Sequence, residues 1–249
     1  MIASLPMYDM PPVMAANDRL WAAIRDGMRA LGMDAPDALL RSPDDPFGQW
    51  LAPDLILSQT CGMPYRTQLH DKVTLIGTPD FGVEGAPAGY YRSVFVAHRD
   101  DARTRLDQYD GANLAYNATI SQSGWAAPLQ HMAERGLHLR AHLQTGGHRL
   151  SLEAVAAGRA EIAGLDIVSW DVLQSFHPDA AQVKVVAMTD PTPGLPYIAA
   201  KGVDGAAMFD IITAAIAGLS ADDRAATRLK GIVAIPARDY LAVPTPAAA

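Results

Sequence analysis

Two serines in the segment Ser121-Gln122-Ser123-Gly124 carry side chains suited to holding an anion. An apolar run precedes this segment, and a helix-like run, 125–135, follows it, which indicates a strand, a hydroxyl-rich turn and a helix. The first turn of a helix has backbone N–H groups without internal partners and a partial positive charge. Serine hydroxyls beside those groups suit a phosphate, phosphonate or carboxylate. The same pattern also occurs as a plain N-cap, so the rest of the chain must decide.

Short apolar strands alternate with amphipathic helices along most of the chain. We expect strands at 2–7, 55–58, 73–77, 91–97, 114–116, 137–144, 160–165 and 183–188. We expect helices at 19–31, 125–135, 151–158, 169–175, 208–219 and 221–229, a loop at 41–49 and a disordered tail at 244–249. This alternation predicts an α/β protein with mostly parallel sheets flanked by helices. Because it resumes after about residue 111, it also suggests two lobes.

Polar and aromatic residues follow or precede several of the predicted strands. Since ligands of such sheets bind at the carboxyl ends of the strands, these loops are candidates for one site. Besides the serine turn they contain Tyr8, Tyr90, Tyr91, His148 and Asp166. Each also has an ordinary structural interpretation: tyrosines favour strands, a histidine can simply start a helix, and an aspartate can cap one.

The composition excludes some classes of partner. The 249 residues carry a net charge of −7 and no cluster of Lys and Arg, which argues against nucleic acid, because a phosphate backbone favours a basic face. No run approaches the ~20 apolar residues of a membrane span, so no membrane insertion is expected.

The residues indicate neither a metal nor a cofactor. Cys61 is the single cysteine and is expected to be a small buried hydrophobe, and no Cys/His cluster has the spacing of a zinc site. The first residues lack the basic and apolar regions of a secretory signal. We therefore expect a cytoplasmic protein if Met1 is the native start, and a periplasmic one if a signal has been removed.

Several segments, in order, resemble the phosphate/phosphonate family of ABC-transporter substrate-binding proteins. They are 89–96, the serine turn 121–124 with Pro128, 145–148, 154–166 and 189–196. The most specific part is the Ser-x-Ser-Gly pattern together with Gly147-His148 and the Ala-Val-Ala-Ala-Gly run at 154–158. The resemblance spans roughly residues 2 to 240.

This resemblance implies a two-lobed type 2 periplasmic-binding-protein fold with a ligand cleft between the lobes. It divides the chain into lobe 1, residues 1–95 and 190–249, and lobe 2, residues 96–189. It implies capture of a small phosphate, phosphonate or similar anion, an ABC-transporter permease as partner, and no catalytic residue. The ligand contacts that it implies are Tyr8, Tyr90, Tyr91, Ser121, Gln122, Ser123, Gly124, His148 and Asp166, of which Asp166 would bind an amine on the ligand.

One residue departs from the family pattern, because Gln122 replaces the middle hydroxyl of its usual Ser/Thr triplet. Two other functions stay open on the same fold. One is a cytoplasmic enzyme similar to those of menaquinone or thiamine-pyrimidine synthesis, with His148 or Asp166 as acid or base, although no paired nucleophile and base is evident in the sequence. The other is a ligand-sensing domain of a regulatory system.

Overall fold

The computed structural model describes residues 1–41 and 46–246 and divides them into two compact units. Unit 1 consists of Met1–Tyr90 and Pro193–Ala242, and unit 2 consists of Tyr91–Thr192 with the C-terminal residues from Val243. The units differ from the predicted lobes at 91–95, at 190–192 and from residue 243 onward, which we assigned to lobe 1 and which fall in unit 2. The chain passes between the units through β4 (Tyr90–Tyr91) and β10 (Thr192–Pro193), which pair as a two-stranded sheet.

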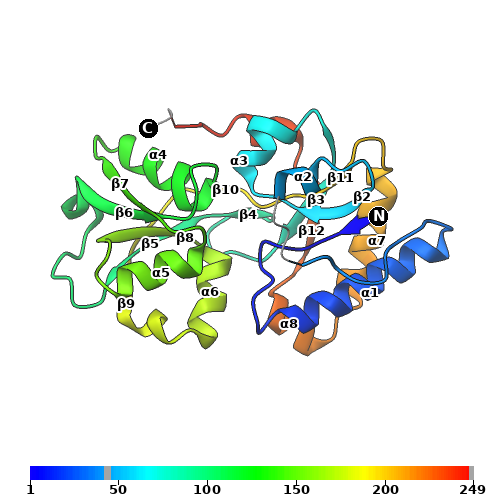
Figure 1. Ribbon diagram of the computed structural model, residues 1–249, viewed down its shortest axis with the longest axis horizontal. Coiled ribbons are helices and arrows are strands. Elements are labelled where there is room, and N and C mark those ends of the chain that lie inside the picture. Colours follow the sequence, from blue (N-terminus) through cyan, green and yellow to red (C-terminus); the bar gives the residue numbers. More distant parts are fainter. Residues whose placement is uncertain (42–45, 247–249) are drawn as a thin grey trace. The chain divides into compact units, whose positions relative to one another are not determined.

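Unit 1 is a five-stranded sheet with helices packed against it (Figure 1). Its strands, in spatial order, are β1 (Ile2–Ala3), β2 (Leu55–Gln59), β11 (Tyr197–Ala200), β3 (Val73–Asp80) and β12 (Gly231–Val233). Its helices are α1 (Met14–Ala30), α2 (Pro46–Trp50), α3 (Gly62–Pro64), α7 (Gly205–Ala217), α8 (Ala221–Thr227) and α9 (Ala237–Leu241), with a π-helical turn at Tyr65–Leu69.

Helix α1 anchors unit 1 through one apolar face. Leu20, Trp21, Ile24 and Met28 recur at helical spacing and are at most 1% exposed in the core that α1 forms with α7 and the sheet. Gly32, with φ of +73°, ends the helix as expected. The helix starts at Met14, five residues before the predicted Arg19, and Asn17 lies inside it and donates to Asp9.

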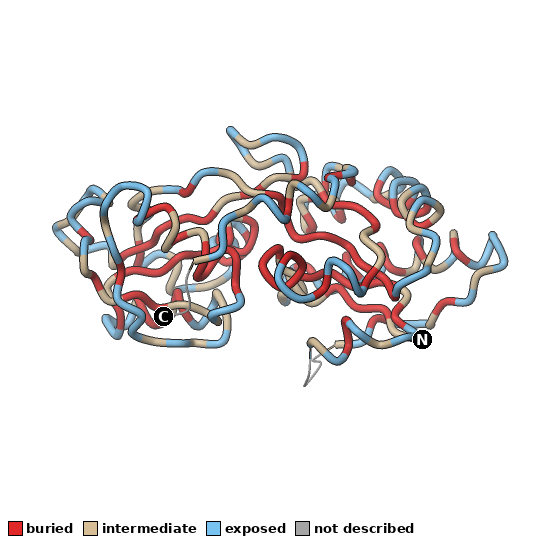
Figure 2. The backbone as a smooth tube through the Cα atoms, turned by 90° about the horizontal axis from the view of Figure 1, so that it is seen from above, coloured by how far each residue is buried: buried red, intermediate tan, exposed pale blue. Residues whose placement is uncertain are grey.

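Unit 2 is built on a second five-stranded sheet, whose three central strands are mostly buried, whereas its two edge strands are mostly half-buried or exposed (Figure 2). Its strands, in spatial order, are β7 (Leu139–Gln144), β6 (Ala112–Tyr116), β8 (Ile162–Asp166), β5 (Ser93–His98) and β9 (Val183–Met188). Its helices are α4 (Ala127–Ala133), α5 (His148–Ala156) and α6 (Ile167–Phe176), with a π-helical turn η3 (Gln122–Ala126) and 3-10 turns at Leu106–Tyr109 and Pro178–Gln182.

The α/β class is confirmed, but the expectation of mostly parallel strands is corrected, because both sheets are mixed. In unit 1, β1 runs parallel to β2, whereas β11 runs antiparallel to both β2 and β3. In unit 2, β6 runs parallel to β7 and β8, whereas β5 runs antiparallel to β8 and β9. The strands that follow the two passages between units, β5 and β11, run antiparallel to both of their neighbours, and β12 runs antiparallel to β3.

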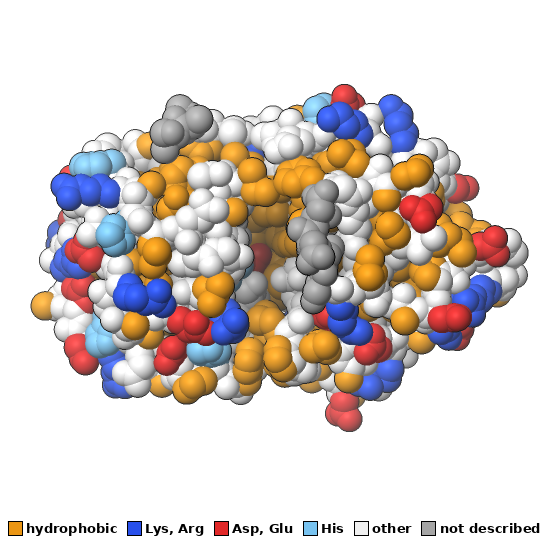
Figure 3. Space-filling model, viewed as in Figure 1, with side chains coloured by type: hydrophobic (Ala, Val, Ile, Leu, Met, Phe, Trp, Pro, Cys, Tyr) orange, Lys and Arg blue, Asp and Glu red, His pale blue; other side chains and the backbone are white. Residues whose placement is uncertain are grey.

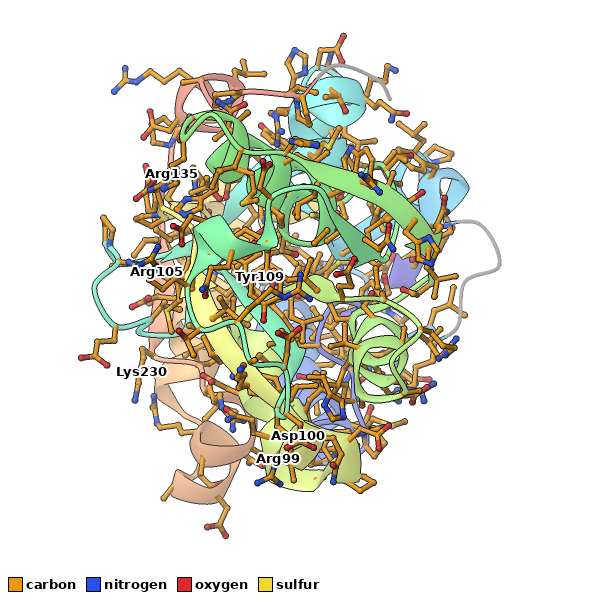
Figure 4. The ribbon with its side chains drawn as sticks, turned by 90° about the vertical axis from the view of Figure 1, so that its left-hand side faces the viewer. Arg99, Asp100, Arg105, Tyr109, Arg135 and Lys230 are labelled. Carbon is orange, nitrogen blue, oxygen red and sulfur yellow. The ribbon has the colours of Figure 1, made fainter. Side chains whose placement is uncertain are left out.

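The loop before β6 carries several charged side chains, of which Arg99, Asp100 and Arg105 are labelled in Figure 4. Arg103 lies 2.7 Å from Asp101, 3.0 Å from Glu161, and 4.1 Å from the ring centre of Tyr109. The hydrogen bond from Arg103 lowers the pKa of Asp101 to about 2. On the face drawn in Figure 3, basic and acidic side chains are interspersed rather than gathered into one patch.

Two expectations for irregular segments need correction. The predicted loop 41–49 contains α2, and the predicted disordered tail is described as far as Pro246, where Val243 and Pro244 line a pocket of unit 2. Residues 42–45 and 247–249 of those two predictions lie outside the described residues.

Candidate functional site

The serine turn lies where the sequence places it, between β6 and a helical segment. Ser121 is the N-cap of η3: its Oγ accepts from the N–H of Gly124 at 2.9 Å, and its carbonyl accepts from Ala126. The i to i+5 bonds of this turn continue into α4. The N-cap interpretation of Ser121 is therefore correct, and the cap fixes the backbone of the segment expected to hold an anion.

The structure brings the second serine to the predicted histidine. Ser123 Oγ lies 3.0 Å from His148 Nε2, although the residues are 25 positions apart. The loops after β6 and β7 meet here, since the N–H groups of Thr145 and Gly146 donate to the carbonyls of Tyr116 and Asn117. The pairing of a hydroxyl with an imidazole was not evident in the sequence.

Burial controls the charge of His148. Desolvation lowers its pKa to about 4, and the backbone of Gly164 opposes this shift only in part. No charged side chain among the described residues contributes to this pKa. At neutral pH the ring is uncharged, so it orients Ser123 by hydrogen bonding rather than attracting an anion as a cation.

We expect the imidazole of His148 to titrate near pH 4 in the folded protein, more than two units below an exposed histidine. Because the unfolded chain takes up this proton first, His148 should reduce stability as pH falls from about 6.5 towards 4. Carbon–proton NMR of the histidine rings between pH 3.5 and 8 measures the midpoint. A midpoint above 6 would contradict the burial argument.

Two glycines allow the serine turn to pack closely. A Cβ on Gly124 would lie 1.9 Å from Oδ1 of Asn117, and a Cβ on Gly164 would lie 2.3 Å from Cγ of Pro128. Asn117 is a site residue that sequence reasoning missed, and its buried Oδ1 has no hydrogen-bond partner among the described residues. Its position directly after β6 was the available signal, because polar residues at strand ends form such sites.

Asp166 is buried at the end of β8 and caps α6. Its Oδ1 accepts from the N–H groups of Val168 at 2.8 Å and Ser169 at 3.0 Å. The capping interpretation of Asp166 is thus correct, and a role in binding a ligand amine stays a prediction. Asp166 pairs in register with Ser93, and Ile167 donates to the carbonyl of Arg92, so the segment after Tyr91 lies beside it.

Three predicted tyrosines have different surroundings. Tyr8 in unit 1 packs edge-on against Phe81 at 5.0 Å and lines a cavity of about 20 Å³ together with Gln59. Tyr90, also in unit 1, is half-buried, and burial and nearby Asp239 raise its pKa. Tyr91 is buried at the start of unit 2. Their part in ligand binding stays a prediction.

Unit 1 contains three buried polar side chains that are joined by hydrogen bonds. Ser4 Oγ lies 2.8 Å from Ser58 Oγ and donates to Oε1 of Gln49 at 2.9 Å. Because the amide oxygen only accepts, Ser58 donates to Ser4. Ser58 ends the predicted strand 55–58, whereas Gln49 lies in the predicted loop 41–49 and was not identified.

The described residues show neither a cluster of metal ligands nor a single membrane-spanning helix. In 1–41 and 46–246, no group of three or more His, Cys, Asp or Glu side chains could hold a metal ion. No single helix within these ranges is long and apolar enough to cross a membrane, although α7 and α8, bent by 115°, together meet the length and composition criteria.

Comparison with known proteins assigns the class. A model of the family described as periplasmic phosphonate substrate-binding proteins of ABC transporters matches residues 59–240. The chain therefore belongs to this periplasmic family of transport proteins, as the resemblance in the sequence indicated. No functionally curated protein matches the chain significantly.

Solved structures support the same fold at low sequence identity. PhnD1 of Prochlorococcus marinus in complex with methylphosphonate is 13% identical, with a TM-score of 0.71 over 96% of this chain and 94% of that one. A binding protein component of a phosphonate transporter from Pseudomonas aeruginosa is 16% identical, with a TM-score of 0.66 over 96% and 82%. A Xanthomonas citri protein bound to ATP is 17% identical, with a TM-score of 0.67 over 96% and 94%. The protein thus has the periplasmic-binding-protein fold.

Proposed function

We propose that this protein binds a small phosphorus-containing anion, a phosphonate or phosphate, and presents it to the permease of an ABC transporter. The observation that carries the proposal is the turn 121–124, in which a capped helix start lies beside the hydrogen-bonded pair Ser123 and His148. Backbone N–H groups and hydroxyls at such a turn favour an anion. Membership in a periplasmic substrate-binding family supports the transporter as partner and the periplasm as location.

Further ligand contacts are proposed on the resemblance to the family. They are Tyr8 and Tyr90 of unit 1 and Tyr91, Gln122, Gly124 and Asp166 of unit 2. Gln122 is of special interest, because an amide replaces the family hydroxyl and carries both a donor and an acceptor. PhnD1, one of the structural neighbours, was solved with methylphosphonate, which makes this compound the first probe to use.

The charge state of His148 supports binding rather than catalysis. A hydroxyl 3.0 Å from an imidazole is also the arrangement of a nucleophile and its base. A general base works best when its pKa lies near the operating pH, whereas burial lowers the pKa of His148 to about 4. His148 is therefore a weak base at neutral pH, and we assign it the positioning of Ser123.

Calorimetric titration of methylphosphonate and inorganic phosphate at pH 7 tests this proposal. Ser123→Ala should lower the affinity for the anion by about 10- to 100-fold, because a hydrogen bond to a charged group contributes about 1.5–3 kcal/mol. Ser175→Ala, which removes an exposed hydroxyl of α6, should leave the affinity unchanged. The proposed site would be refuted if the parent protein bound neither anion, or if the parent protein and Ser123→Ala bound the anion with equal affinity.

A further inference from the structure

A second pocket lies within unit 2, between α4, the segment after β9 and the beginning of the C-terminal segment. Its volume is about 220 Å³, and the residues that matter for its chemistry are Gln130, His131, Glu134, Thr189, Asp190 and Pro244. Gln122 of the serine turn, itself a proposed anion contact, also lines this pocket, whereas Ser121 and Ser123 do not. The proposed anion site uses none of the six residues named.

His131 is the buried polar group of this pocket. The side chain is only 7% exposed, and its Nδ1 is shielded from solvent without a hydrogen-bond partner in the described chain. Burial lowers the pKa of the ring, and Arg135 lowers it further, while Asp190 and Glu134 oppose the shift. The ring also packs against Phe95, with centroids 5.7 Å apart. His131 is therefore an uncharged imidazole at neutral pH.

The rim of the pocket carries an excess of negative charge. Asp190 is 75% exposed, and its Oδ2 lies 3.6 Å from Nδ1 of His131, beyond hydrogen-bond distance. Arg135 lies 3.8 Å from Asp190 and 4.0 Å from Glu134 and extends from the end of α4 (Figure 4). Two carboxylates, one guanidinium and a neutral imidazole leave a net charge of −1.

The distance between His131 Nδ1 and Asp190 Oδ2 indicates which chemical group can bind to both atoms. With its proton on Nε2, the neutral imidazole accepts a hydrogen bond at Nδ1, as a carboxylate oxygen does, and an ammonium group carries three donors. Nδ1 is shielded and the two atoms are only 3.6 Å apart, so an ammonium nitrogen bridges them when the exposed carboxylate of Asp190 turns outward. Beside them, Ala126, Ala127 and Val243 supply an apolar wall.

We propose that this pocket is a second binding site, for a small primary alkylammonium ion whose nitrogen donates to His131 Nδ1 and Asp190 Oδ2. The alkyl group lies against the wall formed by Ala126, Ala127 and Val243. Because the pocket is formed by unit 2 residues and does not use Ser121 or Ser123, this site does not depend on the proposed anion function.

Ethylammonium chloride, titrated into the full chain at pH 7.5 with the histidine rings observed by NMR, tests this site. We expect a saturable shift of the His131 signals, which sodium chloride at equal ionic strength does not produce. Binding should weaken as pH falls and His131 takes up a proton. No saturable shift of His131, or a similar shift with sodium acetate as the probe, would overturn the proposal.

Matched variants distinguish the loss of ethylammonium binding in this pocket from a general effect on the fold. Ala127→Leu places a larger side chain in the wall and should abolish ethylammonium binding, whereas Ala133→Leu, on the exposed end of α4, should leave it intact. Asp190→Asn should weaken binding by tenfold or more, because it removes the anionic acceptor. Equal binding by Ala127→Leu and Ala133→Leu, or undiminished binding by Asp190→Asn, would refute this assignment.

Discussion

Replacing Gly164 with alanine should weaken anion binding about tenfold or more and lower the free energy of unfolding by about 1–3 kcal/mol. An added Cβ would lie 2.3 Å from Cγ of Pro128 and 3.0 Å from the carbonyl oxygen of Ser123. The first contact is far below van der Waals distance, and the second is a few tenths of an ångström too short. The strand or the helix start must move, and either movement displaces Ser123.

Urea unfolding and calorimetric titration of methylphosphonate measure the two effects of Gly164→Ala. Gly231→Ala is the matched control, because a Cβ there meets nothing within 4 Å and its φ is not positive. The control should keep both stability and affinity. An unchanged affinity in Gly164→Ala with a normal fold would show that the position of the serine turn is unimportant for binding.

Replacing Trp21 with alanine should cost about 3–5 kcal/mol of unfolding free energy, the largest effect that we expect on stability. Trp21 is 1% exposed in the core of unit 1, and its indole N–H donates to the carbonyl of Pro36 at 3.2 Å. Removing the ring leaves a cavity between α1 and its neighbours.

Thermal and urea unfolding should therefore show a decrease in melting temperature of about 10 °C for Trp21→Ala. Trp21→Phe retains most of the buried apolar area and loses the hydrogen bond, so its loss should be clearly smaller. A cost below about 1 kcal/mol for Trp21→Ala would contradict the role of α1 as the anchor of unit 1.

Local patterns in the sequence predicted the elements that carry the serine turn. The strand 183–188 has the bounds of β9, and the strand, turn and helix around Ser121 form as expected. These features depend on apolar runs and capping residues within a few positions of one another. The family and the fold class, inferred from such segments, are confirmed.

Features that depend on distant segments were not predictable in the same way. The sequence pointed to both Ser123 and His148, but their 3.0 Å contact depends on the meeting of loops after two different strands. The low pKa of His148 depends on burial, which no local pattern reports. Strand β11 was missed because its four buried residues show neither alternation nor length.

The position of β11 in the sequence determines which of the two units can fold first during synthesis. In the sheet of unit 1, β11 lies between β2 and β3, yet its residues follow the main segment of unit 2. A growing chain therefore presents every strand of unit 2 before the central strand of unit 1 exists. The main segment of unit 2, Tyr91–Thr192, can therefore fold on the ribosome before the sheet of unit 1 is complete, because that sheet requires a strand more than a hundred positions after residue 90.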